Sequence, residues 1–266
     1  MKKETMNINK TNYHIHTYRC KHAAGDAADY CSAAEKAGLE AIGISDHTPL
    51  PDGKWGSVRM DIDELPDYCE KIEDARNEFA GRLEVYAGME CEYFPRYEKF
   101  YNDTLREEFG IEYLAIALHF YPLGGEEIST HAYPMDKDAL KSYTDLFVEG
   151  IKTGMFEFAA HPDLFLARYP SWDSYAEKCS ERICNAATDS GTALEINGYG
   201  FCRDDFSGYP SDNFWRIAAS CGAKGVINSD AHCPEHIDIG FQRCLELAER
   251  LGISLADPVR RAAKPS

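Results

Sequence analysis

The sequence predicts an α/β protein with a mostly parallel sheet of seven strands. Along its 266 residues, seven short apolar segments alternate with longer amphipathic segments of helical character. Strands that alternate with helices favour a parallel sheet, and continuously apolar strands are typical of sheets that are buried on both faces. Both an open doubly wound sheet and a closed barrel fit this pattern.

The expected strands are short and rich in apolar residues. AIGIS (41–45) and YLAIALH (113–119) show this most clearly, because each is almost wholly apolar before its last residue. YHIH (13–16) is the first of the set and KGVINSD (224–230) is the last. The seven expected strands cover residues 13–16, 41–45, 83–90, 113–119, 156–161, 193–197 and 224–230.

Helices are expected in the longer segments between these strands. Gly38 stands where the first helix would end, since glycine readily adopts the left-handed conformation found after helix C-termini. Pro66 indicates that the second helix starts late or bends near its beginning. No glycine-rich phosphate loop opens a helix, which weighs against a dinucleotide-binding sheet. The six expected helices cover residues 27–38, 62–82, 138–154, 174–191, 211–222 and 241–252.

Composition restricts the organisation, location and partners that we expect. Residues 1–266 contain no internal repeat or linker, and their number suits one barrel domain. The net charge of −17 argues against a nucleic-acid polymer as partner. No segment approaches the roughly 18 apolar residues of a membrane span, and the N-terminus lacks the apolar core of a secretory signal. Ten cysteines without a CxxC pair are expected to be reduced, so we expect a cytoplasmic protein without membrane contact.

Every expected strand carries an imidazole or a carboxylate at, or just beyond, its C-terminal end. In a closed parallel barrel these ends converge on one mouth, where such barrels perform their chemistry. Imidazole and carboxylate are usual ligands of zinc, iron and manganese, and nine of them would serve about three ions. The nine candidate ligands are His14, His16, His22, His47, Glu90, His119, His161, Asp230 and His232.

The motifs around these residues resemble those of the PHP (polymerase and histidinol phosphatase) family, most closely its histidinol-phosphatase type. HIHTYRCKH, ISDHT, GME, ALHF, AHPD and NSDAH follow one another in the family's order between residues 13 and 245. The resemblance implies a distorted seven-stranded (β/α)7 TIM-like barrel that binds three divalent ions of zinc, iron or manganese. It also implies three ligand groups, with Glu90 shared by the first two: His14, His16, Glu90 and Asp230; Glu90, His119 and His161; and His22, His47 and His232.

Further polar residues near the strand ends are candidates for supporting or catalytic roles. Asp46 would orient a liganding imidazole, as carboxylates often do. Glu195 and Asn197 would bind substrate or water. Glu92 or Glu195 would suit the cationic amine of histidinol, and His131 would line the pocket or protonate the leaving group.

Two arginines are candidates for phosphate binding. Arg168 follows the fifth expected strand and could hold phosphate oxygens through two parallel hydrogen bonds. The resemblance supports a basic residue in this region. Arg203 follows the sixth strand, in a loop that is longer than the family pattern leads us to expect.

The expected function is a metal-dependent phosphomonoesterase. Metal ions lower the pKa of bound water from about 15.7 towards 7, so attack by a metal-bound hydroxide on phosphorus is expected at neutral pH. The resemblance makes L-histidinol phosphate the expected substrate, which would be hydrolysed to L-histidinol and phosphate in histidine biosynthesis.

Three alternatives remain open. The same site could act on another small phosphoester or on a nucleotide. An amidohydrolase-like C–N hydrolase also starts with an HxH strand, but such enzymes commonly use a bridging lysine at a later strand end, and none is present here. A metal-binding protein without catalytic activity is the third alternative.

Overall fold

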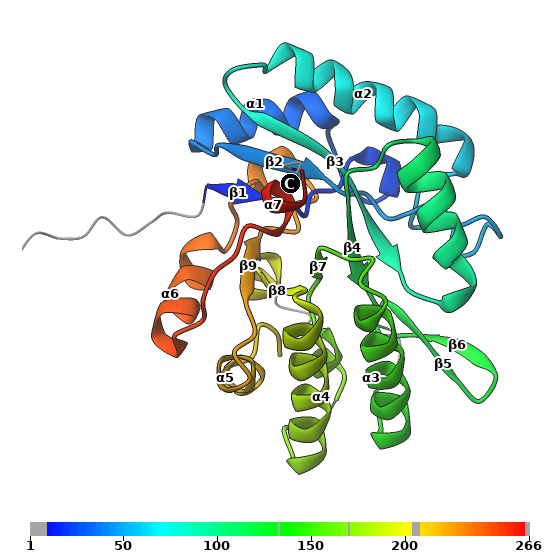
Figure 1. Ribbon diagram of the computed structural model, residues 1–266, viewed down its shortest axis with the longest axis vertical. Helices are drawn as coiled ribbons and strands as arrows, with labels where there is room; N and C mark the ends of the chain where they lie inside the picture. Colours follow the sequence, from blue (N-terminus) through cyan, green and yellow to red (C-terminus); the bar gives the residue numbers. More distant parts are fainter. Residues whose placement is uncertain (1–9, 132–133, 170, 204–207, 264–266) are drawn as a thin grey trace, which may run out of the picture.

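Seven parallel strands form the centre of the protein in the computed structural model, which describes residues 10–131, 134–169, 171–203 and 208–263 (Figure 1). The strands lie side by side in the order β1-β2-β3-β4-β7-β8-β9, and each neighbouring pair is parallel. Their bounds are Thr11–Asn12, Ala41–Ile44, Glu84–Glu92, Tyr113–Ala117, Phe158–Ala159, Ala193–Asn197 and Gly225–Asn228.

The sheet curls until its first and last strands meet, which makes a nearly closed barrel. Ile15 and Ala231 form a parallel bridge just beyond β1 and β9. The His16 N–H donates to the Ala231 carbonyl at 2.9 Å, and the Ala231 N–H donates to the His14 carbonyl at 3.2 Å. The predicted (β/α)7 TIM-like barrel is therefore confirmed, and the open sheet is excluded.

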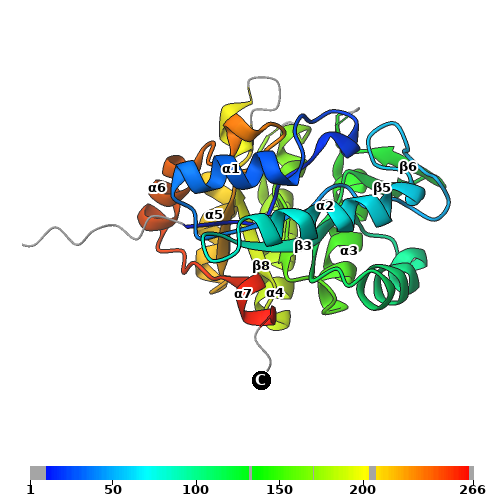
Figure 2. The same cartoon turned by 90° about the horizontal axis from the view of Figure 1, so that it is seen from above.

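Helices surround the barrel. Their bounds are Ala27–Ala37 (α1), Leu65–Glu78 (α2), Lys137–Lys152 (α3), Ser174–Ser190 (α4), Asp212–Ser220 (α5), Phe241–Leu251 (α6) and Pro258–Ala263 (α7). Helices α1 and α2 pack side by side, as do α3 and α4 (Figure 2). Gly38 ends α1 in the left-handed conformation at φ 77°, and Pro66 lies in the first turn of α2, so both expectations about helix ends are confirmed.

Apolar side chains fill the interior of the barrel at its N-terminal end. Val259 of α7 packs there against a buried cluster that includes Tyr13, Tyr113 and Phe158. The Tyr113 ring needs glycine at positions 43 and 88, because a Cβ at either position would overlap it. Apolar packing thus closes this end, and polar side chains are left at the C-terminal mouth.

Four features differ from the sequence prediction, and the first is helix α7, which none of the six expected helices covers. The first strand is Thr11–Asn12 rather than 13–16, because its regular pairing with β2 ends at Asn12. Beyond it, the Ile15 carbonyl accepts the Ser45 N–H at 2.8 Å, and Ile15 forms an isolated bridge with Ala231 on its other side. A hairpin of β5 (Phe120–Leu123) and β6 (Glu126–Ser129) follows β4. A π-helical segment, Phe100–Glu108, precedes β4.

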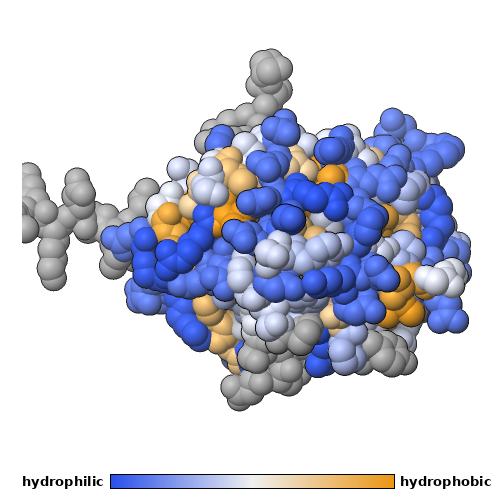
Figure 3. Space-filling model, turned by 90° about the horizontal axis from the view of Figure 1, so that it is seen from below, coloured by the Kyte–Doolittle hydropathy of each residue, from blue (hydrophilic) through white to orange (hydrophobic). Residues whose placement is uncertain are grey.

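The surface is largely polar on the face drawn in Figure 3, with apolar atoms in small separate patches. Within the described ranges, none of the helices combines the length and the apolar character needed to cross a membrane.

Candidate metal centre

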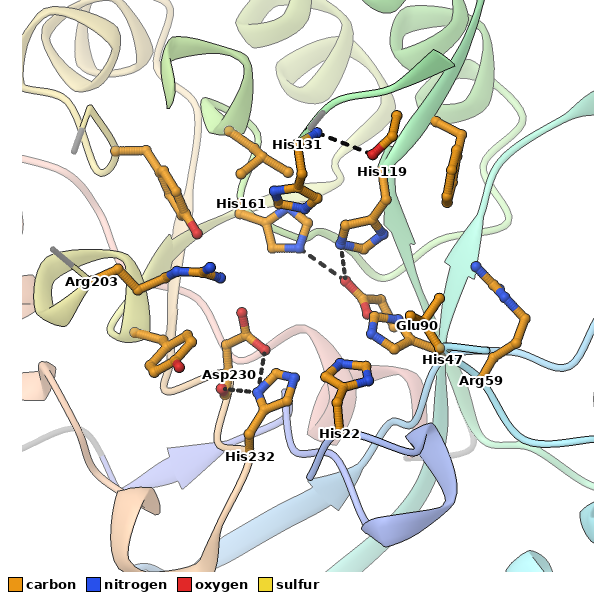
Figure 4. A pocket seen from close by; sticks show the side chains of 16 residues that line it. His22, His47, Arg59, Glu90, His119, His131, His161, Arg203, Asp230 and His232 are labelled. Atoms are coloured by element: carbon orange, nitrogen blue, oxygen red, sulfur yellow. Dashed lines mark hydrogen bonds and ion pairs between the residues drawn. The ribbon is translucent and has the colours of Figure 1, made fainter. Parts of the chain in front are cut away.

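A pocket of about 450 Å³ opens at the C-terminal mouth of the barrel, where the predicted ligands converge (Figure 4). Two of the nine, His14 and His16, are completely buried at its base. The other seven line the pocket: His22, His47, Glu90, His119, His161, Asp230 and His232.

Glu90, near the end of β3, lies at the centre of this cluster. Its Oε1 is 2.9 Å from His161 Nε2 and 3.3 Å from His14 Nε2. Its Oε2 is 2.6 Å from His47 Nδ1 and 3.6 Å from His16 Nε2. One carboxylate thus contacts four imidazoles from three different parts of the chain, which suits a group that bridges two ions.

Asp230 is the second carboxylate, and it follows β9 with a left-handed backbone (φ 57°). Few residues other than glycine adopt this conformation, and it is commonly found at functional sites. Asp230 Oδ1 lies 3.2 Å from His16 Nε2 and 3.6 Å from His14 Nε2. The backbone turn therefore directs the carboxylate back over the first two histidines.

His22, His47 and His232 form a third group at the pocket surface, with one ligand atom of each within 4.8 Å of the others. His22 Nδ1 donates to the Cys20 carbonyl at 2.7 Å, and His232 Nδ1 donates to the Asp230 carbonyl at 2.9 Å. These bonds fix the proton on Nδ1 in both rings, so Nε2 is the atom left to bind a metal.

The electrostatics of the cluster favour a bound cation. Burial lowers the pKa of His16 to about 3 and that of His47 well below its usual value, so both rings are neutral. Burial opposes ionisation of Glu90, but the imidazoles of His47, His14 and His119 hold its pKa well below the usual range. Burial alone would lower the pKa of His14. The carboxylates of Glu195, Asp230 and Glu90 outweigh this effect and raise the pKa of His14 well above its usual value. This position therefore strongly favours positive charge.

Unpaired buried atoms give an independent test of whether metals fit here. His14 Nε2, both ring nitrogens of His16, and Asp230 Oδ1 form no hydrogen bond with any residue that the structure describes. Such atoms are costly unless something binds them. Mixed imidazole and carboxylate donors suit zinc, iron or manganese, so these residues fit divalent ions well.

Two predicted residues, Glu195 and Asn197, lie behind the histidines and Asp230 and hold them in place. Glu195 Oε1 accepts from His14 Nδ1 at 2.7 Å, and its Oε2 accepts the His161 N–H at 2.8 Å. Asn197 donates to Glu195 Oε2 at 2.9 Å and to Asp230 Oδ2 at 3.1 Å. Both side chains are completely buried, so they do not have the substrate-facing position that the sequence suggested.

Glu92 and Asp46 are likewise buried beside the cluster. Glu92 accepts the backbone N–H groups of His119 and Phe120 at 2.8 and 2.9 Å, and it lies 3.2 Å from His119 Nδ1. It therefore contacts a histidine rather than facing the pocket. Asp46 accepts two hydrogen bonds from Thr17, and burial raises its pKa to about 7. Its Oδ1 is 3.8 Å from His16 Nδ1, which fits the expected orienting position.

The predicted arginines differ in position. Arg203 lines the pocket, and its guanidinium lies 5.4 Å from the centre of the Tyr199 ring. Arg168 is not among the described pocket-lining residues, and its Nε donates to the His131 carbonyl at 2.8 Å. His131 itself lines the pocket, but burial lowers its pKa to about 3, which is unfavourable for a proton donor at neutral pH.

Several pocket residues are missing from the sequence prediction. Val58 and Arg59 come from the loop after β2, and Tyr209 comes from the loop before α5. None of them adjoins the end of a strand, so the strand-end pattern could not reveal them. Phe120 directly follows His119, but an aromatic residue there reads equally well as part of the core.

Comparisons with known proteins agree with this geometry. A family model described as "PHP domain" matches residues 12–198. A Deinococcus radiodurans protein named "Probable histidinol-phosphatase" is 32% identical over 240 residues, which cover 86% of this chain and 88% of the relative. A Bacillus subtilis histidinol-phosphatase is 30% identical over 97 residues, 34% of this chain and 36% of the relative.

A solved structure shares the fold. The histidinol phosphate phosphatase of Lactococcus lactis, described as complexed with zinc, L-histidinol and phosphate, superposes with a TM-score of 0.74 at 18% identity. The match covers 93% of this chain and 96% of that one. The family model, the long relative and the shared barrel lead to one conclusion: the chain belongs to the PHP domain family.

Proposed function

We propose that this protein is a metal-dependent phosphomonoesterase that hydrolyses L-histidinol phosphate to L-histidinol and phosphate. The observation that carries the proposal is the cluster of seven imidazoles around Glu90 and Asp230, at the base of a pocket that also contains Arg203. The names of the Deinococcus and Bacillus relatives, and the ligands of the Lactococcus structure, favour histidinol phosphate among small phosphoesters.

We assign three divalent ions to the cluster. Among the described residues the distances give five overlapping groups of three donors, which include His14, His16 and Asp230; His14, Glu90 and His161; and His22, His47 and His232. His14 would bind in the first of these groups only, because its Nδ1 is bonded to Glu195 and Nε2 alone is left for a metal. His119 would complete the second group, because its Nε2 lies 3.7 Å from Glu90 Oε1. Zinc, iron and manganese all suit this donor set.

The bound ions would supply Lewis acidity and ionise water at neutral pH. The protein's own groups would position the reactants. Arg203 would bind the phosphate oxygens from one side of the pocket, while Glu195, Glu92 and Asp46 would orient liganding imidazoles through the hydrogen bonds and contacts described above. We thus assign Glu92 and Glu195 to the support of metal ligands instead of the substrate contacts expected from the sequence. Asn197 supports Glu195 and Asp230 in the same way.

Phosphate release from a panel of esters tests the substrate assignment. Histidinol phosphate, other small phosphomonoesters and nucleotides would be supplied to protein whose metal content is measured in the same preparation. We expect the highest kcat/KM with histidinol phosphate. A clear preference for a nucleotide would replace the proposed substrate, and no release from any ester by metal-loaded protein would refute the function.

Replacing Arg203 with Met should weaken phosphate binding. Charge-assisted hydrogen bonds of this kind contribute about 1.5–3 kcal/mol, so we expect KM to rise on the order of ten- to a hundredfold. Arg168→Met is the matched control, because Arg168 bonds to the His131 carbonyl instead of lining the pocket. Steady-state kinetics of both variants decide the point; equal effects on KM would contradict the assignment to Arg203.

Replacing Glu195 with Gln should loosen His14 without removing a ligand. The change weakens the acceptor for His14 Nδ1, and partners of this kind typically contribute ten- to a hundredfold in metal affinity or activity. Competition with a chromophoric chelator measures the metal affinity directly. Unchanged affinity and activity in a folded E195Q protein would show that the carboxylate does not position the ligand.

A further inference from the structure

Two walls of different chemistry face each other across the metal-ligand cluster. Arg203 lies on one side of the labelled histidines and Arg59 on the other (Figure 4). Tyr199 and Tyr209 line the pocket with Arg203, while Val58 and Phe120 line it with Arg59. The proposed function uses the first wall for the phosphate and leaves the second without a role.

The second wall is built around stacked aromatic rings. The Phe120 ring lies parallel to that of Trp55, with centroids 3.9 Å apart and an interplanar angle of 11°. Phe94 stacks on the same indole at 5.9 Å, and the Arg59 guanidinium lies 5.4 Å from its centre. We call Trp55, Val58, Arg59 and Phe120 the aromatic wall.

Hydrogen bonds fix the aromatic wall relative to the metal centre. The Phe120 N–H donates to Glu92 Oε1, the same carboxylate oxygen that accepts the His119 N–H. Arg59 Nη1 donates to the Thr48 carbonyl at 2.8 Å, which holds the loop after β2 against the barrel. The Phe120 ring is thus adjacent in the chain to a proposed metal ligand and backed by Trp55, so its position is fixed before any substrate binds.

We infer that the aromatic wall binds the leaving group of the substrate and selects a flat ring, with Phe120 as the specificity-determining contact. This inference rests on the proposed function. Phosphate held over the ions and by Arg203 leaves the other half of the pocket for the alcohol. Flat rings stack favourably on a preformed aromatic face. Arg59 adds no net charge to this wall, because its guanidinium pairs with Glu92 Oε2 at 4.0 Å.

A matched pair of substrates separates ring recognition from phosphate chemistry. L-Histidinol phosphate and L-leucinol phosphate share the amine and the phosphate ester, but only histidinol phosphate carries a ring. Aromatic pairs gain about 0.5–1.5 kcal/mol beyond simple burial, so Phe120→Leu should lower kcat/KM for histidinol phosphate roughly three- to tenfold. Hydrolysis of leucinol phosphate should change much less, and product inhibition by L-histidinol should weaken by a similar factor.

Phe94→Leu is the control variant. Phe94 stacks on Trp55, but in the part of the chain that the structure describes it does not line the pocket. We expect F94L to leave the preference between the two esters unchanged. Equal losses for both esters in F120L, or the same change of preference in F94L, would overturn the inference while leaving the phosphatase proposal intact. If wild-type protein hydrolysed neither ester, the proposed function itself would fail, and this inference with it.

Discussion

Glu90→Gln is expected to lose bound metal and at least a thousandfold in phosphatase activity. The amide keeps the size of the side chain but removes the negative charge that contacts His14, His16, His47 and His161. Lewis-acid stabilisation by bound ions is worth several kcal/mol, and each 1.36 kcal/mol corresponds to a factor of ten in rate. Metal content per chain and phosphate release from the same preparation measure both effects.

Glu84→Gln is the matched control for this experiment. Glu84 begins the same strand, β3, but its side chain is largely exposed and pairs with Arg260 away from the pocket. We expect E84Q to retain its metals and its turnover. A Glu90→Gln protein with a full metal complement and near-normal turnover would refute the central role given to this carboxylate.

Removing the metals should also destabilise the fold. His14, His16, Glu90 and Asp230 are almost completely buried, and several of their polar atoms have no hydrogen-bond partner among the described residues. A ligand at a thousand times its Kd stabilises the folded state by about 4 kcal/mol. For a chain of this size, we therefore expect removal of the metals to lower the Tm by about 10 °C. Chelation followed by thermal unfolding measures the shift.

Readdition of metal and the Glu90→Gln variant provide the controls. Zinc, manganese or iron(II) should restore both Tm and activity in wild-type protein, and chelator should shift the Tm of E90Q far less. A metal-free wild-type protein that unfolds at the same temperature as the loaded form would show that the cluster does not depend on ions for its stability.

Much of the fold could be predicted because its determinants are local. Apolar runs of strand length and amphipathic runs of helix length depend on residues close together in the chain, and all six predicted helices and six of the seven predicted strands overlap elements of the structure. The first strand is the clearest error, since its regular pairing with β2 stops at Asn12 and residues 14–16 bond both to Ser45, just after β2, and to Ala231, just after β9. The β5–β6 hairpin was also missed, although Gly124-Gly125 between two short runs is a recognisable turn signal.

The local sequence is enough to predict which metal donors reach the mouth of the barrel. Parallel strands carry their C-terminal residues to one end, so an imidazole or a carboxylate after every strand implies a cluster wherever the barrel closes. The contacts of the remaining polar groups, in contrast, depend on how distant segments pack together. Glu195 and Glu92 face histidines rather than the pocket, and Arg168 bonds to a carbonyl, while Arg59 and Phe120 line the pocket. The reason is that these hydrogen-bond partners lie far apart in the chain and meet only when the chain packs. The local spacing of residues therefore cannot predict them.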